Sequence, residues 1–208
     1  MACYTGPKCK HCRREGEKLF LKGTRCVTVK CAIAKRAYPP GMHPYRRGKV
    51  SEFGRQLREK QRAKRTYGIL ERQFRRYYEM AERQKGNTGE NLLRIMERRL
   101  DNVLYLAGFA ASRSTARQMV AHGHIEVNGK KTDIPSMLVR TNDIIKVRAG
   151  DARKKLVTDF QQMTKERGQP PWLAVNNEQL SIQVLALPKA EEFSVPIQYN
   201  LIVELCSK

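Results

Sequence analysis

The chain has 208 residues, with 41 Lys and Arg against 20 Asp and Glu, which gives a formal net charge of +21 at pH 7. This excess is larger than solubility requires, so it indicates a polyanionic partner. The 40% of hydrophobic residues suffices for one large or two small domains, and no run approaches the roughly 18 apolar residues of a membrane span. The start has neither an apolar signal core nor a lipidation motif, so we expect a cytoplasmic protein with reduced cysteines and no membrane partner.

The positive charge is concentrated in the first 87 residues. They carry 24 basic and 7 acidic side chains, a net charge of +17, whereas residues 88–208 carry 17 and 13, a net charge of +4. Such an excess repels itself unless counter-charges arrive, and a phosphate backbone supplies them while releasing its condensed cations. The N-terminal portion is therefore predicted to be the main electrostatic contact.

Residues 1–45 lack long periodic segments and hold four of the six cysteines, as Cys9-x-x-Cys12 and Cys26-x-x-x-x-Cys31. Two close pairs across a loop suit tetrahedral thiolate coordination, so we predict a structural Zn²⁺ site that staples this extension. An iron–sulfur cluster at the same cysteines is one alternative, and reduced cysteines buried as small hydrophobic residues are another. The site would hold basic side chains in a fixed array for phosphates, among them Lys8, Lys10, Arg13 and Arg14.

A basic helical domain is predicted to follow over residues 46–97. Ser51 opens a helix with so little apolar surface that it must lean on a neighbour or on RNA. The next helix, from Ile69 to Lys85, sets Phe74, Tyr77 and Tyr78 on one stripe at helical spacing. The basic residues of these helices that we expect to contact RNA are Arg55, Arg58, Arg62, Arg65 and Arg72.

The stretch from Arg98 to Arg148 is typical of a compact RNA-binding module, with two basic amphipathic helices leading into antiparallel strands. Arg113 and Arg117 stand four residues apart on one face of the second helix, opposite an apolar face. Asn128-Gly129 is a strong signal for a two-residue hairpin turn. The RNA contacts expected from this module are Arg113, Arg117, Gln118, His122, His124, Asn128, Lys130 and Lys131.

The remaining sequence completes an α+β fold. A further strand is predicted at Ile144–Arg148 and a helix at Asp151–Arg167, and strands are predicted around 180–184 and at Leu201–Leu205. The predicted architecture is an N-terminal metal-stapled extension and helical domain, an inserted RNA-binding module of two helices on a small antiparallel sheet, and C-terminal strands packing back. The corresponding domains are 1–45, 46–97 completed by 173–208, and 98–172.

No catalytic constellation stands out in the sequence. It contains no phosphate-cradling glycine loop, no Gly-x-Ser-x-Gly and no His-Glu-x-x-His, so we predict that the protein is not an enzyme. An RNA-modifying enzyme such as a pseudouridine synthase would need a catalytic domain, for which the rest of the chain offers no room. A zinc-bearing transcription regulator would need a recognition helix and a short duplex site.

Several longer motifs identify a family. They are Tyr-x-Gly-Pro at 4–7, Arg-Arg-Glu-Gly at 13–16, Leu-Arg-Glu-Lys-Gln at 57–61, Leu-Glu-Arg-Gln-Phe-Arg at 70–75, Gly-Asn-Thr-Gly-Glu-Asn-Leu-Leu at 86–93, Arg-Leu-Asp-Asn-Val at 99–103 and Leu-Ile-Val-Glu-Leu at 201–205. Over nearly the whole chain they resemble the bacterial small-subunit ribosomal protein S-four family, in its four-cysteine, metal-binding variant.

The resemblance implies a structural constituent of the small ribosomal subunit that binds its rRNA early, at a multi-helix junction of the five-prime domain, and nucleates assembly of the subunit body. It also implies a place beside the channel through which mRNA enters, together with small-subunit proteins three and five, and an influence on translational accuracy. The matching basic loop is Arg46, Arg47 and Lys49. We expect a ribosomal location and no homo-oligomer.

Overall fold

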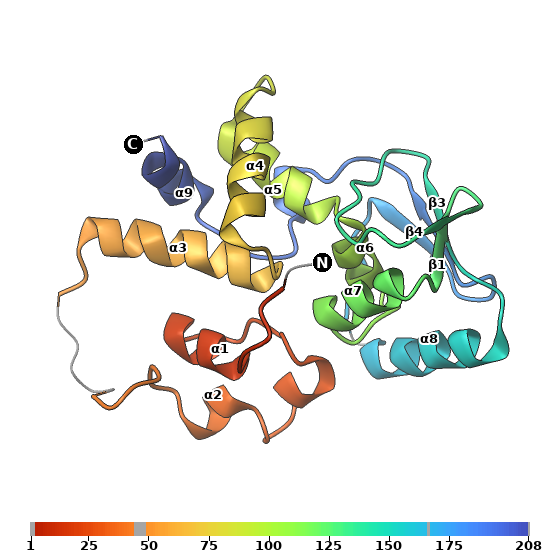
Figure 1. The fold of residues 1–208 in the computed structure, drawn as a ribbon, viewed down its shortest axis with the longest axis horizontal. Coiled ribbons are helices and arrows are strands. Elements are labelled where there is room, and N and C mark those ends of the chain that lie inside the picture. Colours follow the sequence, from red (N-terminus) through yellow and green to blue (C-terminus); the bar gives the residue numbers. More distant parts are fainter. Residues whose placement is uncertain (1–2, 44–48, 166, 208) are drawn as a thin grey trace. The chain divides into compact units, whose positions relative to one another are not determined.

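The computed structural model describes residues 3–43, 49–165 and 167–207 (Figure 1). The chain divides into two compact units, and the α+β class is confirmed. Unit 1 comprises Met1–Leu92 and Pro196–Lys208, and unit 2 comprises Leu93–Val195.

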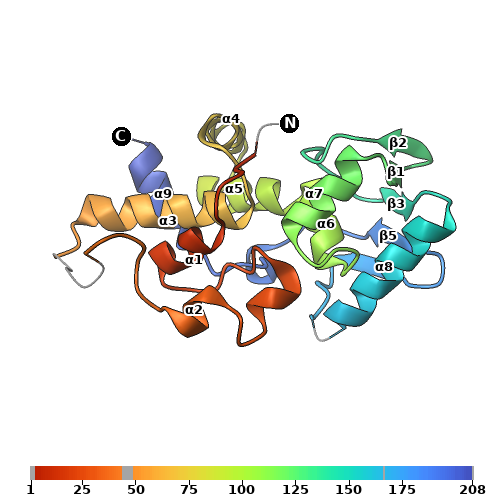
Figure 2. The same ribbon diagram turned by 60° about the horizontal axis from the view of Figure 1, so that its bottom comes forward.

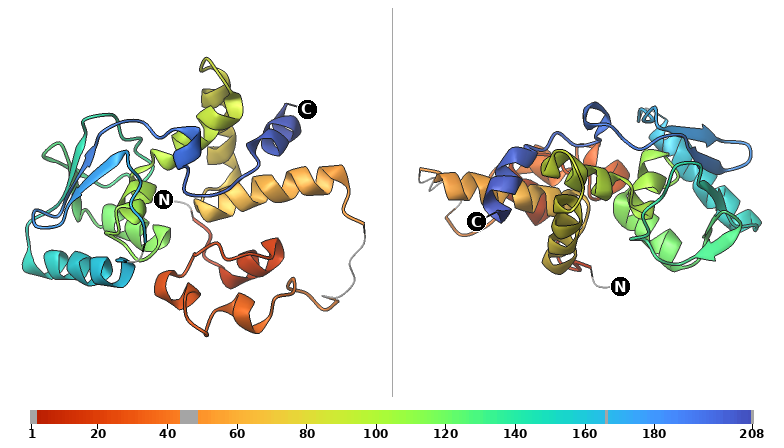
Figure 3. Two further views of the ribbon diagram at one scale, coloured as in Figure 1. Left: turned by 180° about the vertical axis from the view of Figure 1, so that it is seen from behind. Right: turned by 90° about the horizontal axis from the view of Figure 1, so that it is seen from above.

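Unit 1 is helical in its described residues. Its elements are α1 (Cys9–Glu15), a 3-10 turn η1 (Gly23–Cys26), α2 (Ala32–Lys35), α3 (Glu52–Thr66), α4 (Glu71–Glu82), the first half of α5 (Thr88–Glu97) and α9 (Tyr199–Cys206). Helix α1 contacts both α2 and α3, and α3 contacts α9 (Figures 2 and 3). The N-terminal extension and the end of the chain therefore both pack on α3.

The helices of unit 1 follow the local signals in the sequence. The Ser51 hydroxyl accepts a hydrogen bond from the Gly54 amide at 3.2 Å and so caps α3. The apolar stripe predicted for α4 is confirmed, because Phe74, Tyr77 and Tyr78 are all buried. Helix α3, which has little apolar surface of its own, leans on its neighbours as its composition requires.

The strand predicted at Leu201–Leu205 is wrong, because these residues lie in α9. A short apolar run has no periodicity that separates a buried strand from a buried helix, so its neighbours decide. Here the neighbour is α3: Ile202 is fully buried, and Gln56 Nε2 of α3 donates a hydrogen bond to Glu204 Oε2 at 2.9 Å.

Unit 2 combines helices with an antiparallel sheet. After α6 (Leu100–Leu106) and α7 (Arg113–Ala121) come β1 (Ile125–Val127), β2 (Lys130–Thr132), β3 (Ile144–Val147), α8 (Asp151–Thr164), β4 (Leu173–Asn176), β5 (Ser181–Val184) and η2 (Ala190–Glu192). The strand order is β2-β1-β3-β5-β4. The predicted module of two helices on a small antiparallel sheet is confirmed, as are the strands expected near 144–148 and 180–184.

The core of unit 2 joins α6, α7 and α8 to the sheet, beside which they lie in Figure 1. Leu104, Val120, Ile125 and Ile145 are fully buried. The sequence predicts that residues 173–208 complete the helical domain, whereas in the structure 173–195 lie in unit 2 and only 196–208 in unit 1. The reason is strand pairing, since β5 pairs with β3 and thereby extends the sheet.

Candidate nucleic-acid interface and cysteine site

A cluster of nitrogen-bearing side chains gathers where α7 meets β1. Gly123, with φ 69°, ends the helix, and the antiparallel pairing of β1 with β3 brings Arg148 beside His124. The Arg148 amide donates to the His124 carbonyl at 2.9 Å, and its Nη1 donates to the Gly123 carbonyl at 3.2 Å. Lys131 crosses the same point, because a Cβ built on Gly123 would lie 2.5 Å from Lys131 Cε. We call His122, Gly123, His124, Lys131 and Arg148 the junction cluster.

The two histidines of the junction cluster differ in their surroundings. Their ring centroids lie 5.9 Å apart, and His122 is exposed. Burial lowers the pKa of His124, and the nearby Arg153 and His122 lower it further, which favours the neutral imidazole. Its Nδ1 is buried without a hydrogen-bond partner among the described residues. His124 therefore places a ring nitrogen without a hydrogen-bond partner at the end of α7.

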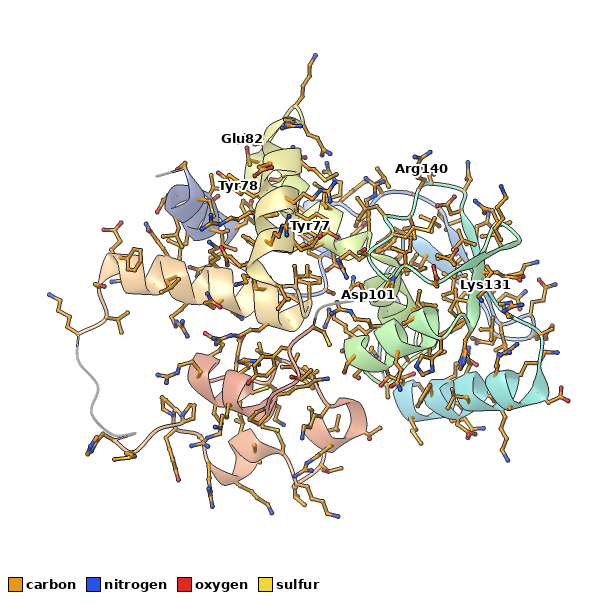
Figure 4. All side chains as sticks on the ribbon, in the orientation of Figure 1. Tyr77, Tyr78, Glu82, Asp101, Lys131 and Arg140 are labelled. Atoms are coloured by element: carbon orange, nitrogen blue, oxygen red, sulfur yellow. The ribbon has the colours of Figure 1, made fainter. Side chains whose placement is uncertain are left out.

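The hairpin beside the cluster has the geometry that its sequence predicts. Asn128 and Gly129 have φ of 52° and 76°, as a type I′ turn requires. Asn128 is occupied inside the protein, since its Nδ2 donates to Asp143 Oδ1 and its Oδ1 accepts from the Ile144 amide, both at 2.9 Å. Lys130 and Lys131 of β2 are exposed on the edge of the sheet (Figure 4 labels Lys131).

The two arginines expected on the outer face of α7 instead turn toward α6. Arg117 donates from Nε and Nη2 to Asp101 Oδ2, at 2.9 and 2.7 Å (Asp101 is labelled in Figure 4). Arg113 is buried, donates to Asn102 Oδ1 at 2.7 Å and stacks over the Tyr105 ring at 4.3 Å. Both guanidiniums thus have partners within unit 2, and their contact with RNA stays a prediction. Gln118, on the same helix, is exposed.

In unit 1 the arginines of α3 fall into two groups. Arg58, Arg62 and Arg65 are paired with carboxylates of the N-terminal extension, while Arg55 is exposed. On α4, Arg72 is exposed, and so are two further arginines that the sequence-based predictions omit, Arg75 and Arg76. The helical spacing of 72 and 76 around the buried stripe was a signal that could have identified Arg76.

The basic residues of the extension are partly engaged in holding it together. Arg13 Nε donates to the Tyr38 carbonyl at 3.0 Å and its guanidinium lies over the Tyr38 ring, and Arg14 donates to the Pro40 carbonyl at 3.3 Å. Lys8 is half-buried, and Lys10 and Lys49 are exposed. The predicted contacts Arg46 and Arg47 lie outside the described residues.

The four predicted metal ligands come together around one cavity. Cys9, Cys12, Cys26 and Cys31 line it together with four further residues, Lys22, Arg25, Ala32 and Ile33. Helix α1 places the first two cysteines three residues apart, on one face of the helix.

The cavity is a largely buried environment for thiols. Cys12, Cys26 and Cys31 are buried, and burial raises the pKa of the Cys12 and Cys26 thiols, because the thiolate loses hydration. All the described cysteines are free. As arranged, no three or more His, Cys, Asp or Glu side chains of the described segments form a metal-holding group. The chemistry of the cysteine set suits a soft metal, so the metal stays a prediction to be tested.

No helix in the described part of the chain is both long and apolar enough to cross a membrane. Residues 3–97 match the family described as Ribosomal protein S4/S9 N-terminal domain, and residues 98–145 match the S4 domain. The chain is similar over all 208 residues, 100% of both chains, to proteins named small ribosomal subunit protein uS4. Those from Acetivibrio thermocellus, Thermoanaerobacter sp. strain X514 and Thermodesulfovibrio yellowstonii are 56%, 55% and 53% identical to it.

Proposed function

This chain belongs to the uS4 family of small ribosomal subunit proteins, structural proteins and not enzymes, and on that premise we propose that it binds small-subunit rRNA early and nucleates assembly of the subunit body. The coarse function follows from the family: it is a ribosomal protein that binds rRNA through its S4 domain. The finer proposal is that it grips a multi-helix junction of the five-prime domain of the rRNA.

The observation that carries this proposal is the junction cluster beside an edge strand of exposed lysines. RNA helices are recognised by shape, phosphates and 2′-hydroxyls more than by base edges, so a rigid group of donors at a helix end suits them. The Lys131 stem is held over Gly123, and Arg148 is held by the Gly123 carbonyl. The exposed arginines of α4 provide a second cationic surface within unit 1.

The test is the salt dependence of rRNA binding. The logarithm of the binding constant falls linearly with the logarithm of the salt concentration. Lys130→Ala with Lys131→Ala should reduce the magnitude of this slope by about 0.7–0.9 for each phosphate that is no longer neutralised. The matched control is Lys154→Ala with Lys155→Ala, which removes two exposed lysines of α8. Equal slopes for the two double variants would remove the edge lysines from the interface. Folded rRNA and duplex DNA compared at one salt concentration should show a clear preference for rRNA.

We also propose that the region around Lys49 lies beside the incoming mRNA and near small-subunit proteins three and five, through which the protein influences decoding accuracy. The support is the family and the exposed, basic position of Lys49. A photo-crosslinker placed at position 49 in assembled subunits should capture mRNA downstream of the decoding site, whereas one at position 155 should not. Equal capture from both positions would contradict the proposal.

We propose further that Cys9, Cys12, Cys26 and Cys31 hold Zn²⁺, with an iron–sulfur cluster as the alternative. Their convergence on one cavity supports this set. A bound metal would supply cross-links that the extension needs, because its buried apolar residues are few. Cys9→Ser with Cys12→Ser should abolish metal uptake, and Cys3→Ser, at an exposed cysteine, should not. Elemental analysis and a visible absorption spectrum separate colourless zinc from a cluster, and unchanged metal content in the double variant would refute the site.

A further inference from the structure

Three of the arginines expected to bind RNA are held by two glutamates of the cysteine-bearing extension. Glu15 Oε1 accepts a hydrogen bond from Arg58 Nη1 at 3.3 Å and another from Arg65 Nη1. Glu17 accepts hydrogen bonds from both Nε and Nη2 of Arg62, the second at 2.5 Å, and Arg62 Nη1 also donates to Glu59 Oε1 of α3 at 3.1 Å. The partners are 43 to 50 residues apart in sequence, so these ion pairs dock one segment of unit 1 on another.

The docking is buried at Glu15 and partly exposed at Glu17 and Arg58, whose side chains are 35% and 38% exposed. The Glu15 side chain is 3% exposed, and those of Arg62 and Arg65 are 18% and 22% exposed. Burial raises the pKa of the Glu15 carboxyl even though Arg58 and Arg65 oppose the shift. A carboxylate so placed is stabilised only while its arginines stay beside it, so the pairs hold both partners in position.

The glutamates and the cysteines belong to one short piece of structure. Helix α1 carries Cys9 and Cys12 and ends at Glu15, and Gly16, with φ 79°, turns the chain toward Glu17. The extension buries few apolar side chains besides its cysteines, so its fold depends on whatever links them. The two cysteines of α1 and Glu15 therefore lie within two turns of the same helix.

We infer that Glu15 and Glu17 are positioning residues that withhold Arg58, Arg62 and Arg65 from RNA phosphates while the cysteines hold metal, and that loss of the metal releases these arginines to the RNA. The inference rests on the metal site proposed above. In the metal-bound protein the phosphate contacts of unit 1 come from exposed arginines such as Arg72 and Arg76. These two arginines form no ion pair within the described residues. In the metal-free protein three more guanidiniums join them.

The test compares the salt slope of small-subunit rRNA binding in the loaded and metal-free full-length protein. The triple variant combines Arg58→Gln, Arg62→Gln and Arg65→Gln. It should leave the slope of the metal-bound protein unchanged. In the metal-free protein it should reduce the magnitude of the slope by about 2, at 0.7–0.9 for each phosphate neutralised. The control, Arg72→Gln with Arg76→Gln, should lower the slope by about 1.5 in both states. A fall of about 2 for the triple variant in the loaded state would overturn the inference, because the arginines would then contact phosphates while docked.

A second variant keeps the inference testable without removing metal. Glu15→Gln with Glu17→Gln should increase the magnitude of the slope of the metal-bound protein by about 1.5, because Arg58 and Arg65 lose their partners while Arg62 keeps Glu59. This increase should vanish when the three arginines are also glutamine. An unchanged slope in the glutamate variant would overturn the inference. Metal content is measured on each sample: a wild-type protein that takes up no metal would refute the proposed metal site and the dependence on loading, whereas the glutamate variant still decides whether the arginines are withheld.

Discussion

Asp101 is a buried carboxylate of unit 2 that pairs with two arginines. Its side chain is 2% exposed and accepts hydrogen bonds from Arg99 Nε and Nη2, at 3.0 and 2.7 Å, as well as from Arg117. Asp101→Asn keeps the shape but removes the negative charge. The Arg99 side chain, 3% exposed, then stays buried but loses the charge of Asp101, while Arg117, at 16%, can partly recover by contact with water.

The expected magnitude follows from that difference in exposure. Breaking a buried ion pair by removing one partner costs about 3–5 kcal/mol, because an uncompensated charge stays behind. Since the amide oxygen of asparagine still accepts one hydrogen bond, we expect Asp101→Asn to lower the free energy of unfolding of unit 2 by about 3 kcal/mol. Adding Arg99→Met removes the stranded charge, so the double variant should be less destabilised than the sum of the single variants.

The assay is urea unfolding followed by the fluorescence of Trp172. This is the only tryptophan of the chain, and it is buried in the core of unit 2, so its signal reports on that unit. The matched control is Asp159→Asn, at an exposed aspartate of α8, which should change the stability by less than about 0.5 kcal/mol. A loss below about 1 kcal/mol for Asp101→Asn would refute the reasoning that a buried guanidinium depends on this carboxylate.

Three further changes probe other parts of the chain. Lys60 and Lys64 lower the pKa of Glu71 from 4.5 to about 2 against the effect of burial, so the stability it contributes is complete above pH 4.5 and is lost as the pH falls toward 2. Glu71→Gln should therefore cost about 1 kcal/mol at pH 7, a value discounted for its exposure, and flatten the acid limb of a circular dichroism titration; an unchanged limb would contradict this. Gly89→Ala places a Cβ 2.4 Å from the Tyr199 ring. It should therefore lower the free energy of unfolding by about 1–3 kcal/mol, measured as a lower melting temperature, despite the better helix propensity of alanine. Gly129→Ala meets no neighbouring atom but must hold φ 76°, so a loss of about 1 kcal/mol in urea unfolding is expected, and a gain would contradict it.

Local patterns in the sequence predict local structure well. The Asn128-Gly129 turn, the Ser51 cap and the stripe of Phe74 and Tyr77 on α4 each depend on residues a few positions apart, and each is confirmed. The run at Leu201–Leu205 failed because its neighbour, α3, lies far away in sequence and decides its conformation. For a short apolar segment, packing outweighs propensity.

The candidate site shows the same contrast between local patterns, which the sequence predicts, and long-range contacts, which it does not. The sequence places Arg58, Arg62 and Arg65 on a solvated or RNA-facing surface, because charge periodicity says nothing of a carboxylate more than 40 residues away. Arg148 was missed for a related reason. Only the register of β1 against β3 shows that it lies beside His124, and register is a pairing property that one strand alone does not reveal.

The edge position of β2 has a consequence for the protein before any RNA is present. An edge strand offers unpaired backbone groups to other chains, and natural sheets protect such edges by keeping them short and lysine-rich. With three residues, two of them the exposed Lys130 and Lys131, β2 meets both conditions. The lysines that are predicted to contact phosphates thus also disfavour edge-to-edge association between copies of the protein that have not yet bound RNA.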